Sequence, residues 1–236
     1  MAGPPTDRAA LAALTAEIVA CRRCPRLVEW REHVARERVA RFRDETYWGR
    51  PVPGFGDPDA RILILGLAPA AHGGNRTGRV FTGDASGDFL WPALHQAGLA
   101  DRAVSRSADD GLTLTDVYIA AAVRCAPPAN KPTIVERDTC APFLVREMAL
   151  LTSVRVVLAL GAFGWDAGLR ALTALGHGPA GGAKPRFGHA AEARLGPYVL
   201  LGSYHPSQQN TFTGRLTAAM FDSVIRRARD LAAVTT

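Results

Sequence analysis

Four short apolar runs, separated by helical patterns, limit the folds open to this chain. The runs lie at residues 61–67, 117–123, 154–160 and 198–204. They are rich in branched side chains and short enough to be strands that are buried on both faces. Apolar residues at helical spacing follow or separate them at about residues 86–98, 133–152, 163–175 and 217–233. This alternation predicts an α/β fold in which a parallel sheet carries helices on both faces.

The remaining segments contain no internal repeat and no second domain. We expect one domain over residues 1–236, with residues 1–8 disordered. Asp7 can cap a helix that begins directly after it. Residues 47–58 and 176–189 are rich in glycine and proline, so we interpret the first as an ordered loop and the second as a flexible connection.

Residues 22–43 are dense in charge, and their few apolar members include Trp30 and Phe42. We interpret this segment as a solvated helix with one packed face. A helix that faces DNA is the alternative interpretation.

The charge balance of the whole chain favours a polyanionic partner. The formal net charge is +6 and the isoelectric point is about 9.6. The hydrophobic content of 47% is normal for a globular protein, and no apolar run is long enough to span a bilayer. Residues 1–20 show no secretory signal, so we expect a cytoplasmic protein that is monomeric and has no membrane partner.

The four cysteines occur in two pairs. Cys21 and Cys24 are separated by two residues, whereas Cys125 follows a predicted strand and Cys140 lies in the next predicted helix. Because cytosolic chains rarely keep disulfides, we favour a shared metal centre over buried thiols and a coincidental pair. Four thiolates suit either zinc or a [4Fe–4S] cluster, and they leave no open position for a substrate. The centre would therefore be structural.

Three loops that follow predicted strands contain most of the unusual polar residues. They lie at residues 68–86, 124–133 and 205–215. In parallel sheets, ligands bind at the carboxyl ends of the strands. The glycines of the first loop let the backbone approach a ligand and Phe81 can stack on one, but the Gly-Lys-Ser/Thr of a phosphate-binding loop is absent. Asp84 can act on a ligand or cap the next helix, and His205 is a candidate for site chemistry.

Three segments carry motifs that, taken together, indicate a protein family more specifically than any one of them does alone. They are GLAPAAHG (66–73) with NRTGRVFTGD (75–84), AVRCAPPANK (122–131) and HPSQQNTFTGR (205–215). With the cysteines, they resemble the uracil-DNA glycosylase superfamily, specifically its type-b (family 5) iron–sulfur branch. The resemblance runs from about Cys21 to the last predicted helix and implies a three-layer α/β/α domain with a central four-stranded parallel sheet. It also favours a [4Fe–4S] cluster over zinc, held by Cys21, Cys24, Cys125 and Cys140.

The resemblance implies that DNA is the partner and that the target nucleotide is flipped out of the duplex. By analogy, Phe81 stacks on the flipped base. His205 donates a hydrogen bond to the base carbonyl oxygen, which gains charge as the glycosidic bond breaks. The segment after His205 would press into the minor groove and hold the gap open. The other residues implied to contact substrate or DNA are Gly66, Ala68, His72, Asn75, Ser207, Gln208, Asn210 and Arg215.

The chain departs from the family pattern at two places. Most members carry Asp, Asn or Glu in the first motif to handle water, whereas Leu67 and Ala68 stand here. We therefore assign Asp84 to position the water or stabilise the developing cation. Many members also carry an asparagine at the end of the second strand to recognise uracil, but residues 120–122 are alanines. We expect Asn130, in the following loop, to take over contacts with base or water.

Without the strand asparagine, discrimination among bases should relax. We predict a monofunctional DNA glycosylase that removes uracil and other deaminated bases, such as hypoxanthine and xanthine, and leaves an abasic site. A lysine Schiff base is the covalent alternative, for which Lys131 is better placed than Lys184. The competing function classes are a non-catalytic iron–sulfur module that binds damaged DNA or senses redox state, and a zinc-stabilised nucleotide-binding enzyme.

Overall fold

The computed structural model describes residues 6–233, and residues 1–5 and 234–236 lie outside the described part. The strands are β1 (Phe55–Gly56), β2 (Ile62–Gly66), β3 (Val117–Ala121), β4 (Val156–Leu160), β5 (Glu192–Leu195) and β6 (Tyr198–Ser203). The helices are α1 (Arg8–Ala20), α2 (Pro25–Glu37), α3 (Gly74–Thr77), α4 (Ala85–Gln96), α5 (Ile134–Leu150), α6 (Gly161–Ala174), α7 (Gln208–Phe212) and α8 (Ala218–Ala233). Short 3₁₀ helices are η1 (Ala40–Phe42), η2 (Pro128–Asn130) and η3 (Ala180–Gly182).

The strands form one sheet in the order β1-β3-β2-β4-β6-β5. Its four inner strands are parallel, which confirms the predicted core of the sheet. The two edge strands, β1 and β5, are antiparallel and extend the predicted four strands to six. β5 and β6 form a hairpin in which Leu195 pairs with Tyr198 across a two-residue turn. Because alternate residues of β5 are exposed, it lacks the continuous apolar run that marks the inner strands.

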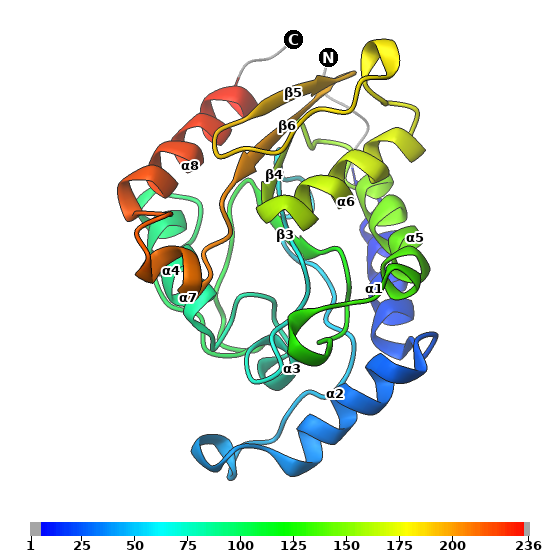
Figure 1. Cartoon of the computed structure of the whole chain (residues 1–236), viewed down its shortest axis with the longest axis vertical. Coiled ribbons are helices and arrows are strands. Elements are labelled where there is room, and N and C mark those ends of the chain that lie inside the picture. The colour runs from blue at the N-terminus through cyan, green and yellow to red at the C-terminus, as the bar shows by residue number, and fades with distance from the viewer. Residues whose placement is uncertain (1–5, 234–236) are drawn as a thin grey trace.

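The side chains of the inner strands enter two apolar layers. Ile62 and Ile64 pack with α4 and α8 on one face of the sheet. Leu63 and Leu65 pack with α5 and α6 on the other face. Figure 1 shows α4 and α8 on one side and α6, α5 and α1 on the other. This is the predicted three-layer α/β/α architecture.

Several helices, among them α1, α4 and α5, begin where a side chain accepts a hydrogen bond from a backbone N–H of the first turn. Asp7 caps α1, Asp84 caps α4, and Thr133 caps α5 in a reciprocal arrangement with Glu136. These caps fix where the helices start, and the cap of α4 places the Asp84 carboxyl group directly after the loop that follows β2.

The charged segment 22–43 is only partly helical. α2 ends before Arg38, which has a left-handed backbone at φ +51°. The side chains of α2 that are buried are Leu27, Val28, Arg31 and Val34, which confirms a helix with one packed face.

The amino-terminal segment expected to be disordered, residues 1–8, is only partly described. Residues 1–5 lie outside the described part of the chain. Thr6 differs from the expectation, because it is buried and its Oγ1 donates a 2.9 Å hydrogen bond to the carbonyl oxygen of Pro58. α1 already begins at Arg8.

The carboxyl ends of the parallel strands lie together at one end of the molecule, the lower end in Figure 1. The short elements α3, η2 and α7 belong to the loops that follow β2, β3 and β6. No helix in residues 6–233 is both long and apolar enough to cross a membrane.

Candidate active site

A cavity of about 560 Å³ opens at the carboxyl ends of the inner strands. This volume is typical of sites that hold a small ligand, which span roughly 300–1,000 Å³. The walls come from segments that are distant in sequence: the loops after β2 and β3 and the segment after β6. The predicted site residues that line the cavity are Gly66, Ala68, Phe81, Asp84, Asn130, His205, Ser207 and Gln208.

Phe81 is held on the cavity wall in a left-handed backbone conformation, at φ +53°. Such a φ is uncommon for a bulky residue and must be stabilised by its surroundings. The indole Nε1–H of Trp91 donates a 2.6 Å hydrogen bond to the Phe81 carbonyl oxygen. Gly87 leaves room for that carbonyl, because a Cβ atom there would collide with it. The ring lies against Gly66 at the end of β2, where a flat ligand can stack on it.

A buried ion pair fixes the loop that carries Phe81. Nη1 of Arg79 lies 2.7 Å from Oδ1 of Asp110 and donates a 2.8 Å hydrogen bond to Oγ of Ser105. The same Ser105 hydroxyl group is 2.7 Å from Oγ1 of Thr82. Because Arg79 and Thr82 flank Phe81 in the loop, the wall is organised before any ligand binds.

Asp84 serves two purposes at once. Its Oδ1 accepts a 3.0 Å hydrogen bond from the backbone N–H of Gly87, so it is a helix cap, and its side chain also lines the cavity. Burial raises the pKa of Asp84, although the N–H groups of the helix start and Arg76 oppose the shift. A Cβ atom at Gly73 would collide with Oδ2 of Asp84, so this glycine makes room for the carboxylate. The group can accept a hydrogen bond from a water in the cavity.

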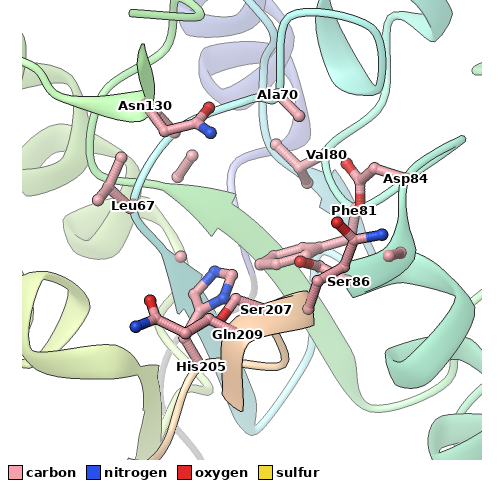
Figure 2. Close-up of a pocket in the computed structure, with 15 residues that line it drawn as sticks. Leu67, Ala70, Val80, Phe81, Asp84, Ser86, Asn130, His205, Ser207 and Gln209 are labelled. Carbon is pink, nitrogen blue, oxygen red and sulfur yellow. The ribbon is translucent and has the colours of Figure 1, made fainter. Parts of the chain in front are cut away.

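His205 follows β6 and faces Phe81, with ring centroids 6.1 Å apart and planes inclined by 37° (Figure 2). The side-chain amide of Asn210 donates a 2.9 Å hydrogen bond to the His205 carbonyl oxygen and fixes the backbone there. Burial lowers the pKa of His205 to about 4, so the imidazole is neutral at pH 7. Within residues 6–233 no hydrogen bond occupies the imidazole, and its N–H can therefore be donated to a ligand.

The wall that includes the end of β3 is largely apolar. Leu67 and Ala121 line the cavity and contribute no polar side-chain group to it. The amide of Asn130 reaches the cavity from η2 (Figure 2), and no described residue hydrogen-bonds to it. Both Ala129 and Asn130 have positive φ, at +51° and +55°, a conformation that asparagine tolerates better than alanine. The loop thus positions one uncommitted amide beside an otherwise apolar wall.

Two predicted contact residues of the first loop do not line the cavity. Nδ1 of His72 lies 3.0 Å from the hydroxyl oxygen of Tyr47. Asn75 is fully buried, and its amide donates a 3.1 Å hydrogen bond to the carbonyl oxygen of Arg31. Both side chains therefore join the loop to residues 31–47.

Two predicted residues of the last loop also lie outside the cavity lining. Asn210 supports the His205 backbone, as described above. The guanidinium group of Arg215 lies 4.7 Å from the centre of the Tyr204 ring. Ser86 and Gln209, which the motifs did not single out, do line the cavity. Their proximity in sequence to Asp84 and Gln208 was the only available signal.

The cysteines surround a second, smaller cavity. The four that line it are Cys21 after α1, Cys24 before α2, Cys125 after β3 and Cys140 within α5. Within residues 6–233, no three cysteine, histidine or acidic side chains are grouped closely enough to hold a single metal ion. The four thiols line the same small cavity.

Two hydrogen-bond donors face the cysteine sulfurs. Nη1 of Arg31, a buried residue, lies 2.9 Å from Sγ of Cys125. The backbone N–H of Arg124 donates a 3.3 Å hydrogen bond to Sγ of Cys140. Donors of this kind stabilise sulfur atoms that carry negative charge, so the surroundings of the cysteines fit thiolate ligands of a metal centre.

Comparison with known families gives one matching family model, that of the uracil DNA glycosylase superfamily, over residues 53–229. These residues include all six strands and every residue named above that lines the active-site cavity.

Individual relatives match over most of the chain. It is 55% identical to a type-5 uracil-DNA glycosylase of Mycobacterium tuberculosis over 94% of this chain and 81% of the relative. It is 55% identical to that of Thermus thermophilus, over 91% and 95% of the two chains. The identity to the type-5 enzyme of Pyrobaculum aerophilum is 46%, over 89% and 88%. The chain therefore belongs to the uracil-DNA glycosylase superfamily, in its type-5 branch.

Proposed function

We propose that this protein is a DNA glycosylase that hydrolyses the N-glycosidic bond of uracil in DNA and leaves an abasic site. The observation that carries the proposal is one cavity lined by a phenylalanine ring, a neutral imidazole and a half-buried carboxyl group. The type-5 relatives at 46–55% identity are named uracil-DNA glycosylases.

Each of the three groups has a step to perform. The flipped base stacks on Phe81, whose ring is already fixed by its neighbours. His205 donates its N–H to the base carbonyl oxygen, where negative charge develops as the bond to the sugar breaks. Asp84 orients the attacking water or stabilises the positive charge on the sugar. Because His205 is neutral at pH 7, it acts as a hydrogen-bond donor without a net charge.

The apolar wall supports a range of substrates wider than uracil. Ala121 presents no amide that a wrong base would leave unpaired, so hypoxanthine and xanthine should also be removed. Asn130 supplies an amide from the loop that follows β3, where a purine or a pyrimidine could reach it.

Plain hydrolysis is favoured over a covalent lysine intermediate. The chain has only two lysines, Lys131 and Lys184, and neither lines the cavity. Lys184 forms an ion pair with Asp166. A monofunctional enzyme that does not cut the DNA strand is therefore expected.

We further propose that Cys21, Cys24, Cys125 and Cys140 hold a [4Fe–4S] cluster. The four thiols line one small cavity, and Arg31 and the backbone N–H of Arg124 donate hydrogen bonds to two of the sulfurs, as suits thiolate ligands. The resemblance of the cysteine arrangement to the iron–sulfur branch favours the cluster over zinc. When bound, the cluster would join α1 and α2 to β3 and α5. All four ligands come from the protein, so its role is structural.

The decisive experiment is an excision assay on one duplex sequence that carries uracil, hypoxanthine or xanthine at the same position. Alkaline cleavage reveals abasic sites, and we expect product from all three lesions. Strict uracil preference would contradict the wider substrate range alone. Tight binding without abasic sites would identify the non-catalytic module instead.

A further inference from the structure

A groove runs along the outer face of α2. Its lining residues are Arg26, Glu29, Trp30, His33, Arg36 and Pro128. The five that belong to α2 recur at spacings of three and four residues, so they share one helix face. This face lies beside the buried side of the helix and contributes nothing to the cavity described above.

The groove adjoins the active-site cavity through η2. Pro128 lines the groove, and Asn130 in the same turn lines the cavity. Nη2 of Arg26 donates a 3.1 Å hydrogen bond to the carbonyl oxygen of Lys131, which ties α2 to this turn. Figure 1 shows α2 at the end of the molecule where the parallel strands finish. A strand of DNA with one nucleotide in the cavity therefore passes close to α2.

The segment around the groove carries most of the net positive charge of the chain. Residues 22–50 contain nine arginines and five acidic residues, a net charge of +4 out of +6 for the whole chain. Within the groove, Arg26 is committed to an ion pair with Glu136 at 2.7 Å, and Glu29 is the one acidic lining residue. Arg36 is exposed, and no described residue forms a hydrogen bond or salt bridge with its guanidinium group. It remains available to a phosphate.

A second donor in the groove also lacks a partner. The indole nitrogen of Trp30 is buried, and no described residue accepts a hydrogen bond from it. Buried donors are rarely left unpaired in folded proteins, so this N–H is expected to gain an acceptor when the side chain moves as a ligand binds in the groove. The Trp30 ring also lies 6.0 Å from that of His33, so the groove combines aromatic faces with positive charge.

We propose that this groove binds the phosphodiester backbone of DNA next to the flipped nucleotide, with Arg36 and Trp30 as its donors. The inference extends the proposed function, because it assigns a surface outside the cavity to the flanking DNA. Contacts of this kind position a duplex and carry no information about the lesion.

The test measures affinity for a duplex with a non-cleavable abasic-site analogue, between 50 and 200 mM salt. Arg36→Ala should weaken binding roughly three- to tenfold and reduce the slope of log K against log salt by about one. Arg36→Lys should retain most of the affinity. The matched control is Arg229→Ala, which removes an exposed arginine of α8 beside the cavity between α8 and residues 98–116.

Turnover measurements distinguish a DNA-binding role of the groove from a catalytic role. With saturating uracil-containing DNA, kcat of Arg36→Ala should equal that of the wild type, whereas KM rises. Trp30→Phe keeps an aromatic ring but removes the indole N–H, and it should also raise KM. Far-UV circular dichroism and metal content confirm that each variant is folded.

The two possible failures are distinguishable. If Arg36→Ala and Arg229→Ala give the same affinity and salt slope, the groove is not a DNA site and the glycosylase proposal is unaffected. If the wild type forms no abasic sites but the Arg36 effect on binding persists, the groove stands and the proposed catalytic function is wrong.

Discussion

The ring of Phe81 lies against Gly66 so closely that a Cβ atom on Gly66 would be 2.6 Å from Cζ of Phe81. This contact joins the end of β2 to the loop that carries the Phe81 ring on the cavity wall. The glycine is thus needed for the position of the ring as well as for the approach of a ligand.

Gly66→Ala should displace Phe81 and weaken stacking on the flipped base. We expect kcat/KM to fall at least about tenfold and the free energy of unfolding to fall by about 1–3 kcal/mol, as in other overpacked cores. Gly178→Ala is the control, because its Cβ would meet Thr173 at an ordinary 3.4 Å. Steady-state kinetics and urea denaturation measure both effects. Equal kinetics in the two variants would contradict a stacking role for Phe81.

Asp84→Asn should abolish most turnover without unfolding the protein. Asparagine caps a helix as well as aspartate does, so stability should change by less than about 0.5 kcal/mol. Loss of the carboxylate should lower kcat on the order of a hundredfold. Asp7→Asn at the cap of α1 provides a control with the same chemical change away from the cavity. Full activity of Asp84→Asn would mean that Asp84 acts only as the cap of α4.

The pH profile provides a second test of Asp84. Burial raises its pKa, so the carboxylate form is lost as the pH falls through that raised value. Wild-type kcat/KM should decline on the acid side with this pKa, and the decline should be absent from the residual activity of Asp84→Asn.

His205 should make the stability of the fold depend on pH. Its pKa is about 4 in the folded protein, whereas an unfolded histidine titrates near 6.5. The unfolded chain therefore takes up the proton first, and the free energy of unfolding decreases as the pH falls from about 6.5 to 4. Denaturant titrations at pH 7 and pH 4.5 should show a smaller decrease for His205→Asn. An unchanged decrease would mean that the imidazole is not desolvated as described.

Metal analysis tests the cysteine centre. The purified protein should contain about four iron and four acid-labile sulfide atoms per chain and absorb visible light. Cys24→Ser should lose both signals, with a lower melting temperature because α1 and α2 are released from α5. Stoichiometric zinc without iron would contradict the cluster and replace it with a single-ion site.

The inner sheet was predictable because its strands are buried on both faces and appear as continuous apolar runs. β5 was not, since alternating exposure and a tight turn give a weak signal in so short a segment. α3 and α7 span only four and five residues, too few for a helical period to appear.

In the site, motif position predicted which loops meet but not which side chains turn inward. Asn75 lies in the same motif as Phe81, yet its amide is buried against α2. The side chain turns away from the cavity because its amide donates a hydrogen bond to the carbonyl oxygen of Arg31, which is distant in sequence. No local sequence pattern predicts such a long-range contact. Asp84 could be interpreted from sequence as either a cap or a site residue, and the structure shows that it lies where it can be both.

The most direct test of the central claim is a single-turnover assay on a duplex with one uracil, comparing the wild type with His205→Ala. We predict abasic sites from the wild type and a rate lower by about a hundredfold or more in the variant, because the hydrogen bond to the departing base is lost. Binding of the duplex should remain detectable in both. A wild type that binds but forms no abasic site, or a variant that retains the full rate, would contradict the account.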